Sequence, residues 1–193
     1  MPLQLKMVRT DYESMPDLVM PTPYEIRTYQ PGDEHHWANI INRAGHLGEF
    51  DSQSVKEKLT GQPQFTPECL LFATIDEEPV ATACAWRDGD SNRRQGQLHM
   101  VAVIPEHQGH RLAYWLSLEA MRKHQDWGMR RLVLFTDDFR LAAVKTYANL
   151  DWQPVYRAPG HFERWHDVYS KLGILDEAAC ARSLAPPTGS PDG

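Results

Sequence analysis

Cysteine is scarce in this sequence, and its three cysteines form no C-x-x-C pair. Cys69 and Cys84 lie in apolar, strand-like segments, which indicates buried thiols rather than a metal site or a nucleophile. No apolar run approaches the roughly 18 residues of a membrane-spanning helix. The N-terminal stretch MPLQLKMVRTDYES also lacks the apolar core of a signal peptide. We therefore expect a protein of the reducing cytoplasm, with no membrane partner.

An excess of basic charge is absent as well. The chain has 20 Lys and Arg against 26 Asp and Glu, a formal net charge of -6. Dedicated DNA-binding proteins are usually basic, so nucleic acid is not expected as the partner. The 12 glycines and 14 prolines among 193 residues are too few for a collagen-like or low-complexity chain. With 41% hydrophobic residues, a chain of this length is expected to form one domain with a full core.

The hydrophobic pattern that is present mixes periods of two and of about 3.6 residues, which predicts an α/β fold with a mixed sheet flanked by helices. Strands are expected at 24–29, 70–75, 80–87, 97–104, 131–136 and 152–156. Helices are expected from Asp33 to Gly45, at 52–59 after the cap Asp51, at 107–127, from Asp137 or Asp138 to about 149, and around 165–172. We divide the chain into an N-terminal extension at 1–23 with a candidate edge strand at 3–8, a domain at 24–175, and a largely disordered tail at 176–193.

The junction after the strand at 97–104 predicts an anion-binding site. Pro105 ends the strand, and a short segment leads into the next helix. Such a junction points free backbone N–H groups and the positive end of the helix dipole at one place, where phosphate is the usual occupant. The sequence contains neither G-x-x-x-x-G-K-[ST] nor G-x-G-x-x-G. An ATP-type phosphate loop and a dinucleotide-binding turn are therefore not expected.

This junction resembles that of the GNAT superfamily of acetyl-CoA-dependent N-acetyltransferases. Members hold the CoA pyrophosphate in a loop Gln/Arg-x-x-Gly-x-Gly/Ala, entered from a strand that ends Val-x-Pro. Here Val103-Ile104-Pro105 precedes Gln108-Gly109-His110-Arg111-Leu112-Ala113. Arg111 replaces the first motif glycine and adds a cation that can reach a phosphate of CoA.

A second stretch, at 143–152, is similar to the family pattern Ala-x-x-x-Tyr-x-x-x-Gly-Phe. Ala143 and Tyr147 match this pattern, whereas Asp151 replaces the glycine and Trp152 the phenylalanine. The opening at 26–34 also resembles the family, so the resemblance covers about residues 24–157.

The resemblance implies a GNAT-like three-layer fold and an N-acetyltransferase with acetyl-CoA as co-substrate. The acetyl group would pass to a primary amine, on a small molecule or a peptide, by direct attack in a ternary complex. CoA would lie in the splay between the strands at 98–104 and 131–136. The residues that would hold it are Val101, Ala102, Val103, Gln108, Gly109, His110, Arg111, Leu112, Ala113, Arg140 and Ala143. Sheet-edge dimers are common in the family, so a homodimer is possible by analogy.

Two residues are candidates for proton transfer. By resemblance, Tyr147 is the general acid that protonates the leaving thiolate; the alternative is a core aromatic residue on a helix. His99 lies on the strand before the phosphate loop, where strict alternation puts it on one face with Val101 and Val103. A histidine pKa near 6.5 suits removal of the amine proton. The alternative for His99 is a histidine with a purely structural role.

Other polar residues have weaker claims. His46, Glu49, Asp137 and Asp138 are candidates for an acceptor site, with loop positions and helix caps as the alternatives. His35-His36 has no third ligand at a usual spacing, so no metal is expected. Arg93-Arg94 is expected to be a solvated loop segment.

Two other functions stay open: an acyl-CoA-binding module without transfer, motivated by Arg111 and Asp151, and a protein–protein scaffold that uses the tail and the helix around Trp165.

Overall fold

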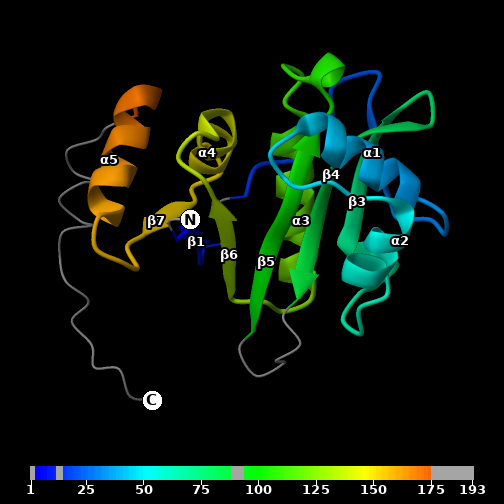
Figure 1. The fold of residues 1–193 in the computed structure, drawn as a ribbon, viewed down its shortest axis with the longest axis horizontal. Helices are drawn as coiled ribbons and strands as arrows, with labels where there is room; N and C mark the ends of the chain where they lie inside the picture. Colours follow the sequence, from blue (N-terminus) through cyan, green and yellow to red (C-terminus); the bar gives the residue numbers. More distant parts are fainter. Residues whose placement is uncertain (1–2, 12–14, 88–93, 175–193) are drawn as a thin grey trace.

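The computed structural model describes residues 3–11, 15–87 and 94–174 and contains a seven-stranded sheet flanked by helices (Figure 1). The strand order is β2-β3-β4-β5-β6-β1-β7. The strands are β1 (Leu5–Arg9), β2 (Glu25–Thr28), β3 (Leu70–Ile75), β4 (Glu78–Arg87), β5 (Gln95–Val103), β6 (Arg131–Thr136) and β7 (Gln153–Val155). The helices are α1 (Glu34–Ala44), α2 (Ser52–Val55), α3 (Leu112–Asp126), α4 (Leu141–Ala148) and α5 (His161–Leu172). The predicted α/β class with a mixed sheet is confirmed, because β5 and β6 pair in parallel and the other neighbours pair antiparallel.

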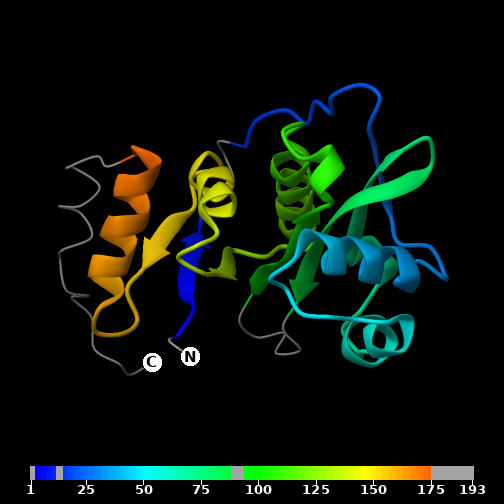
Figure 2. The same ribbon diagram turned by 45° about the horizontal axis from the view of Figure 1, so that its top comes forward.

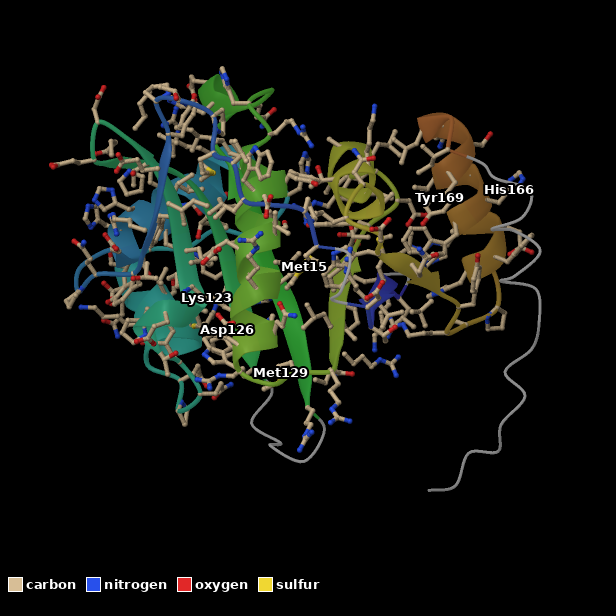
Figure 3. All side chains as sticks on the ribbon, turned by 180° about the vertical axis from the view of Figure 1, so that it is seen from behind. Met15, Lys123, Asp126, Met129, His166 and Tyr169 are labelled. Carbon is tan, nitrogen blue, oxygen red and sulfur yellow. The ribbon has the colours of Figure 1, made fainter. Side chains whose placement is uncertain are left out.

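The sheet separates two helical layers. α1 and α2 lie in front of it in Figure 1, and α3 lies behind it, which the view from behind in Figure 3 shows directly. Ala81, Ala83 and Ala85 are fully buried on the face of β4 that receives α3. Side chains without bulk let a helix approach the sheet closely, as the run of alanines predicts.

The N-terminal strand is not at an edge of the sheet. β1 begins two residues later than expected and lies between β6 and β7, pairing with both. Its two backbone edges are therefore hydrogen-bonded, and Leu5 and Met7 are fully buried on one face. The prediction of an edge strand is wrong, because the pattern of residues 3–8 specifies a strand but not its neighbours. The proposed tail at 176–193 lies outside the described residues.

The segment that follows β1 returns to β2, at the opposite edge of the sheet (Figure 2). On the way it passes α3, where Met15 packs against the core (Figure 3). The Arg122 guanidinium donates to the Pro16 carbonyl at 2.7 Å. These contacts join the N-terminal segment to the rest of the domain at β1 and at residues 15–16.

Helix starts differ from the predictions in two places. α3 begins at Leu112 rather than at residue 107, because a 3-10 turn at Pro105–His107 and a left-handed residue, Arg111, come first. α4 begins at Leu141 with no side-chain cap, so neither predicted aspartate caps it. By contrast, Asp51 does cap α2 and forms a reciprocal capping box with Ser54. No helix in the three described ranges is both long and apolar enough to cross a membrane.

Candidate active site

The site begins where β5 and β6 part. Their parallel register joins Gln95–Gln97 to Arg131–Val133, whereas β5 runs on to Val103 and β6 to Thr136. A cavity of about 740 Å³ is lined by residues 101–103 of β5, the loop and first turn of α3, and one side of α4. Its volume is in the range of small-molecule sites.

A β-bulge shapes the β5 wall of this cavity. Thr82 of β4 pairs with Ala102 of β5, and Cys84 pairs with His99. Two steps along β4 therefore correspond to three steps along β5. Met100 lies in the extra step and has a φ of +50°. A bulge takes backbone groups out of the regular ladder and turns the strand, and the next residue, Val101, lines the cavity.

The loop before α3 forms one end of the cavity. Gly109 has a φ of +85° and Arg111 a φ of +59°, and the Gln108 side chain donates to the Val103 carbonyl at 3.3 Å. The first N–H groups of α3 have no acceptor within the helix, which is the property that makes such a start bind anions. Arg111 adopts the left-handed conformation that glycine would take, and its guanidinium lies 4.4 Å from the Tyr114 ring centroid.

Charge in the cavity is of one sign. No carboxylate of the described residues lines it. Five basic or imidazole side chains do, namely those of His46, His107, Arg111, Arg140 and Lys145. Such a wall suits a ligand with several phosphate groups.

The acetyltransferase (GNAT) family model matches residues 22–152. The chain belongs to the GNAT family of acetyltransferases. Mycothiol acetyltransferase from Streptomyces bingchenggensis is 30% identical over 138 residues, which are 69% of this chain and 44% of that protein. The chain spans about half the length of the curated relatives it matches.

Solved structures confirm the GNAT fold. A GCN5-related N-acetyltransferase from Sphaerobacter thermophilus has a TM-score of 0.67 at 20% identity, covering 78% of this chain and 48% of that one. Diaminobutyrate acetyltransferase EctA from Paenibacillus lautus, in complex with L-2,4-diaminobutyric acid and coenzyme A, has a TM-score of 0.58 at 16% identity. That match covers 67% of this chain and 75% of the EctA chain.

In this GNAT domain the tyrosine of the family pattern reaches the cavity. Tyr147 lies on α4, lines the cavity and is 6% exposed. Burial raises the pKa of Tyr147 to about 12, and the charge of Arg140 opposes part of this rise. The phenol is therefore protonated at neutral pH.

Of the predicted CoA-binding residues, all but His110 line the cavity; His110 packs instead against the Tyr24 ring, with centroids 5.3 Å apart.

His99 is placed differently from the prediction. The extra residue in the bulge reverses the alternation, so His99 shares its face with Ala102, while Val103 points to the other face. His99 does not line the cavity; its Nδ1 lies 3.1 Å from Gln97 Nε2, and its ring faces Trp86. Gly96 faces His124 of α3, so by alternation His99 points to the opposite side of the sheet, and burial lowers its pKa.

Of the four candidates for an acceptor site, His46 lines the cavity and the other three do not. His46 lines the cavity, and its ring packs edge-on against Phe139 at 5.3 Å, whereas Glu49 does not line it. Asp138 is bound by the Arg164 guanidinium, and Asp137 accepts from Gln4 at 3.3 Å. Neither aspartate lines the cavity, and neither caps α4.

Some features of the site have no signal in the sequence. Tyr24 Oη lies 2.9 Å from His107 Nδ1 and so joins the residue before β2 to the 3-10 turn before α3. Cys69 and Cys84 are buried as predicted, but their sulfur atoms lie only 3.9 Å apart. Tyr24 and His107 are 83 residues apart in the chain, and Cys69 and Cys84 are 15 residues apart. Within the described ranges no three side chains are grouped as metal ligands, and Arg93 lies outside those ranges.

Proposed function

We propose that this chain transfers the acetyl group of acetyl-CoA to a primary amine in a ternary complex. The observation that carries the proposal is the single cavity that joins the bulged strand, the phosphate loop and Tyr147. The cationic lining fits the phosphates of CoA. The acceptor is a small molecule or a peptide with a free amino group.

The phosphates would bind at one end of the cavity. Residues 108–113 offer the N–H groups at the start of α3, and Arg111 adds a permanent charge. Val101–Val103 and Ala143 supply the apolar walls along the splay. The thioester carbonyl then meets the N–H groups freed by the bulge, which stabilise the oxyanion that develops during attack.

Attack needs the neutral amine, whose conjugate acid has a pKa of about 10. Forming the C–N bond and breaking the C–S bond leaves a thiolate, to which Tyr147 gives its proton. The pKa of Tyr147, about 12, is higher than the roughly 8.5 of a free thiol. A lasting phenolate is therefore disfavoured, so Tyr147 acts as a relay that regains a proton as the amine nitrogen loses one. The charge of Arg140 lowers the cost of any transient phenolate.

His99 is the candidate base. It shares a face of β5 with Ala102, on the side of the sheet where α1 packs. Its lowered pKa keeps it neutral at pH 7. Because it does not line the cavity, it takes through water, on the acceptor side, the proton that the ammonium group loses before attack. The second proton, which the nitrogen loses after attack, is the one that returns to Tyr147.

The test combines binding with transfer. Acetyl-CoA at about 100 times its Kd should stabilise the protein by roughly 2.7 kcal/mol and raise its Tm by about 5–11 °C. A panel of primary amines should then release free thiol from acetyl-CoA in proportion to enzyme. A Tm rise without thiol release with any amine would favour the acyl-CoA-binding module. No rise at millimolar acetyl-CoA would favour the scaffold.

A further inference from the structure

The helix that carries Tyr147 ends in a Schellman motif. The Asp151 N–H donates to the Ala148 carbonyl at 3.0 Å, and the Trp152 N–H donates to the Tyr147 carbonyl at 3.1 Å. Asp151 has a φ of +57°, as the motif requires at the position after the helix. The Trp152 ring packs against the Tyr147 ring, with centroids 6.4 Å apart, and supplies the apolar contact of the motif. The geometry of this cap therefore sets the place of the Tyr147 ring.

The cap is built on an unfavourable residue. Glycine adopts a left-handed conformation without strain, whereas a side chain at that φ is disfavoured. Asp151 stands where the family pattern has glycine, so the cap needs support from elsewhere in the chain.

Strand β1 supplies that support through Arg9, which is 2% exposed. The Arg9 Nη1 donates to the Leu150 carbonyl at the end of α4 and lies 3.5 Å from the Asp151 carboxylate. Its Nε donates to the Asp11 carbonyl at 2.7 Å, which fixes the guanidinium from the other side. A cation at a helix C-terminus also interacts favourably with the helix dipole. Because the Asp151 side chain is 71% exposed, the bond to the carbonyl is the stronger of the two contacts with the cap.

We propose that Arg9 is a positioning residue for Tyr147. It does not line the cavity; it acts by completing the cap of α4, whose last turn holds the phenol in the cavity. This inference rests on the proposed function of Tyr147. It makes strand β1 part of the working site, although the family match begins only at residue 22.

The experiment compares Arg9→Met and Arg9→Lys with wild type, below the Tm of every variant. Arg9→Met should lower kcat about 10- to 100-fold and leave the KM for acetyl-CoA within about twofold, because the cofactor walls are untouched. Arg9→Lys keeps the charge and should retain more of kcat. The matched control is Lys6→Met on the same strand, which removes a cation beside Phe135 and should leave kcat unchanged.

A double-mutant cycle separates positioning from general stabilisation. In a Tyr147→Phe background, Arg9→Met should reduce the residual kcat by less than twofold, because there is no phenol left to position. An equal loss in both backgrounds, or an unchanged kcat in Arg9→Met, would overturn the inference. Asp151→Gly restores the unstrained cap, and kcat should then depend less on Arg9; equal dependence would also count against it.

A readout without catalysis keeps the inference separate from the proposed function. In a spectrum of ¹³C-labelled tyrosine, the Tyr147 ring signal is assigned by its loss in Tyr147→Phe. This signal should shift in Arg9→Met and stay in place in Lys6→Met, even if the chain transfers no acetyl group. A signal that does not respond to Arg9 would refute the positioning role, whatever the activity.

Discussion

The imidazole of His124 lies against the α-carbon of Gly96, so closely that a β-carbon on Gly96 would stand 2.3 Å from Nδ1. His124 is fully buried on α3, and Gly96 pairs with both β4 and β6 at the root of the splay. The spacing between α3 and the two strands that border the cavity therefore depends on the absence of a side chain at this position.

Gly96→Ala should destabilise the fold by about 1–3 kcal/mol, because neither the buried ring nor the paired strand can move aside freely. Denaturant unfolding measures the loss. In a His124→Ala background the obstacle is gone, and the same substitution should cost clearly less. Equal costs in both backgrounds would show that the contact is not the cause.

The buried imidazole of His124 makes the free energy of unfolding depend on pH. Burial lowers its pKa to about 4, against about 6.5 in the unfolded chain. The folded state therefore binds this proton less readily, so stability is full above pH 6.5 and falls as the pH drops toward 4, by up to about 3 kcal/mol. The free energy of unfolding measured from pH 7.5 to 4.5 should fall more steeply for wild type than for His124→Gln. Parallel curves would remove His124 as the source.

Arg111→Gly should weaken binding of acetyl-CoA about tenfold or more, through loss of a charge-assisted contact with phosphate. Glycine accepts the φ of +59° found here, so the loop keeps its path and stability should not fall. Isothermal titration of acetyl-CoA at two salt concentrations measures the effect, which should shrink at high salt. Arg130→Gln, an exposed change outside the cavity, is the control and should bind as wild type does.

Tyr147→Phe should lower kcat by about 100-fold or more, in line with the loss of a general acid, with the Kd for acetyl-CoA within about twofold. Thiol release and titration of acetyl-CoA provide the two numbers. A kcat equal to that of wild type would remove Tyr147 from the mechanism and leave it as a core residue of α4.

His99→Gln should lower kcat/KM at neutral pH about tenfold or more and abolish the acid limb of the pH–rate profile. Because burial lowers the pKa of His99, the limb should lie below pH 6.5, with activity lost as the imidazole becomes protonated. Profiles from pH 5 to 9 for both proteins measure this. An acid limb that survives in His99→Gln would assign the base to another group.

That the loop before α3 and Tyr147 lie at one cavity can be predicted from the sequence, because each depends on a short run of neighbouring residues. The face of His99 cannot, since one extra residue at Met100 reverses every later side chain on β5. The position of β1 in the sheet cannot be predicted either, because its hydrophobic pattern does not specify the strands with which it pairs. Asp137 and Asp138 show the same limit, since their partners, Gln4 and Arg164, come from distant segments.

The insertion of β1 between β6 and β7 also has a consequence for how the chain acquires its structure. Strands β2 to β5 pair in antiparallel succession along the chain, whereas Leu5 must find Thr136, and Lys6 must find both Phe135 and Val155. Closing such long loops costs entropy before the contacts compensate, which slows these steps relative to local pairing. During synthesis β1 leaves the ribosome long before its two partners exist. We therefore expect the part of the sheet formed by β6, β1 and β7, and with it the Arg9 contact to the end of the helix that carries Tyr147, to be the last part of the molecule to form.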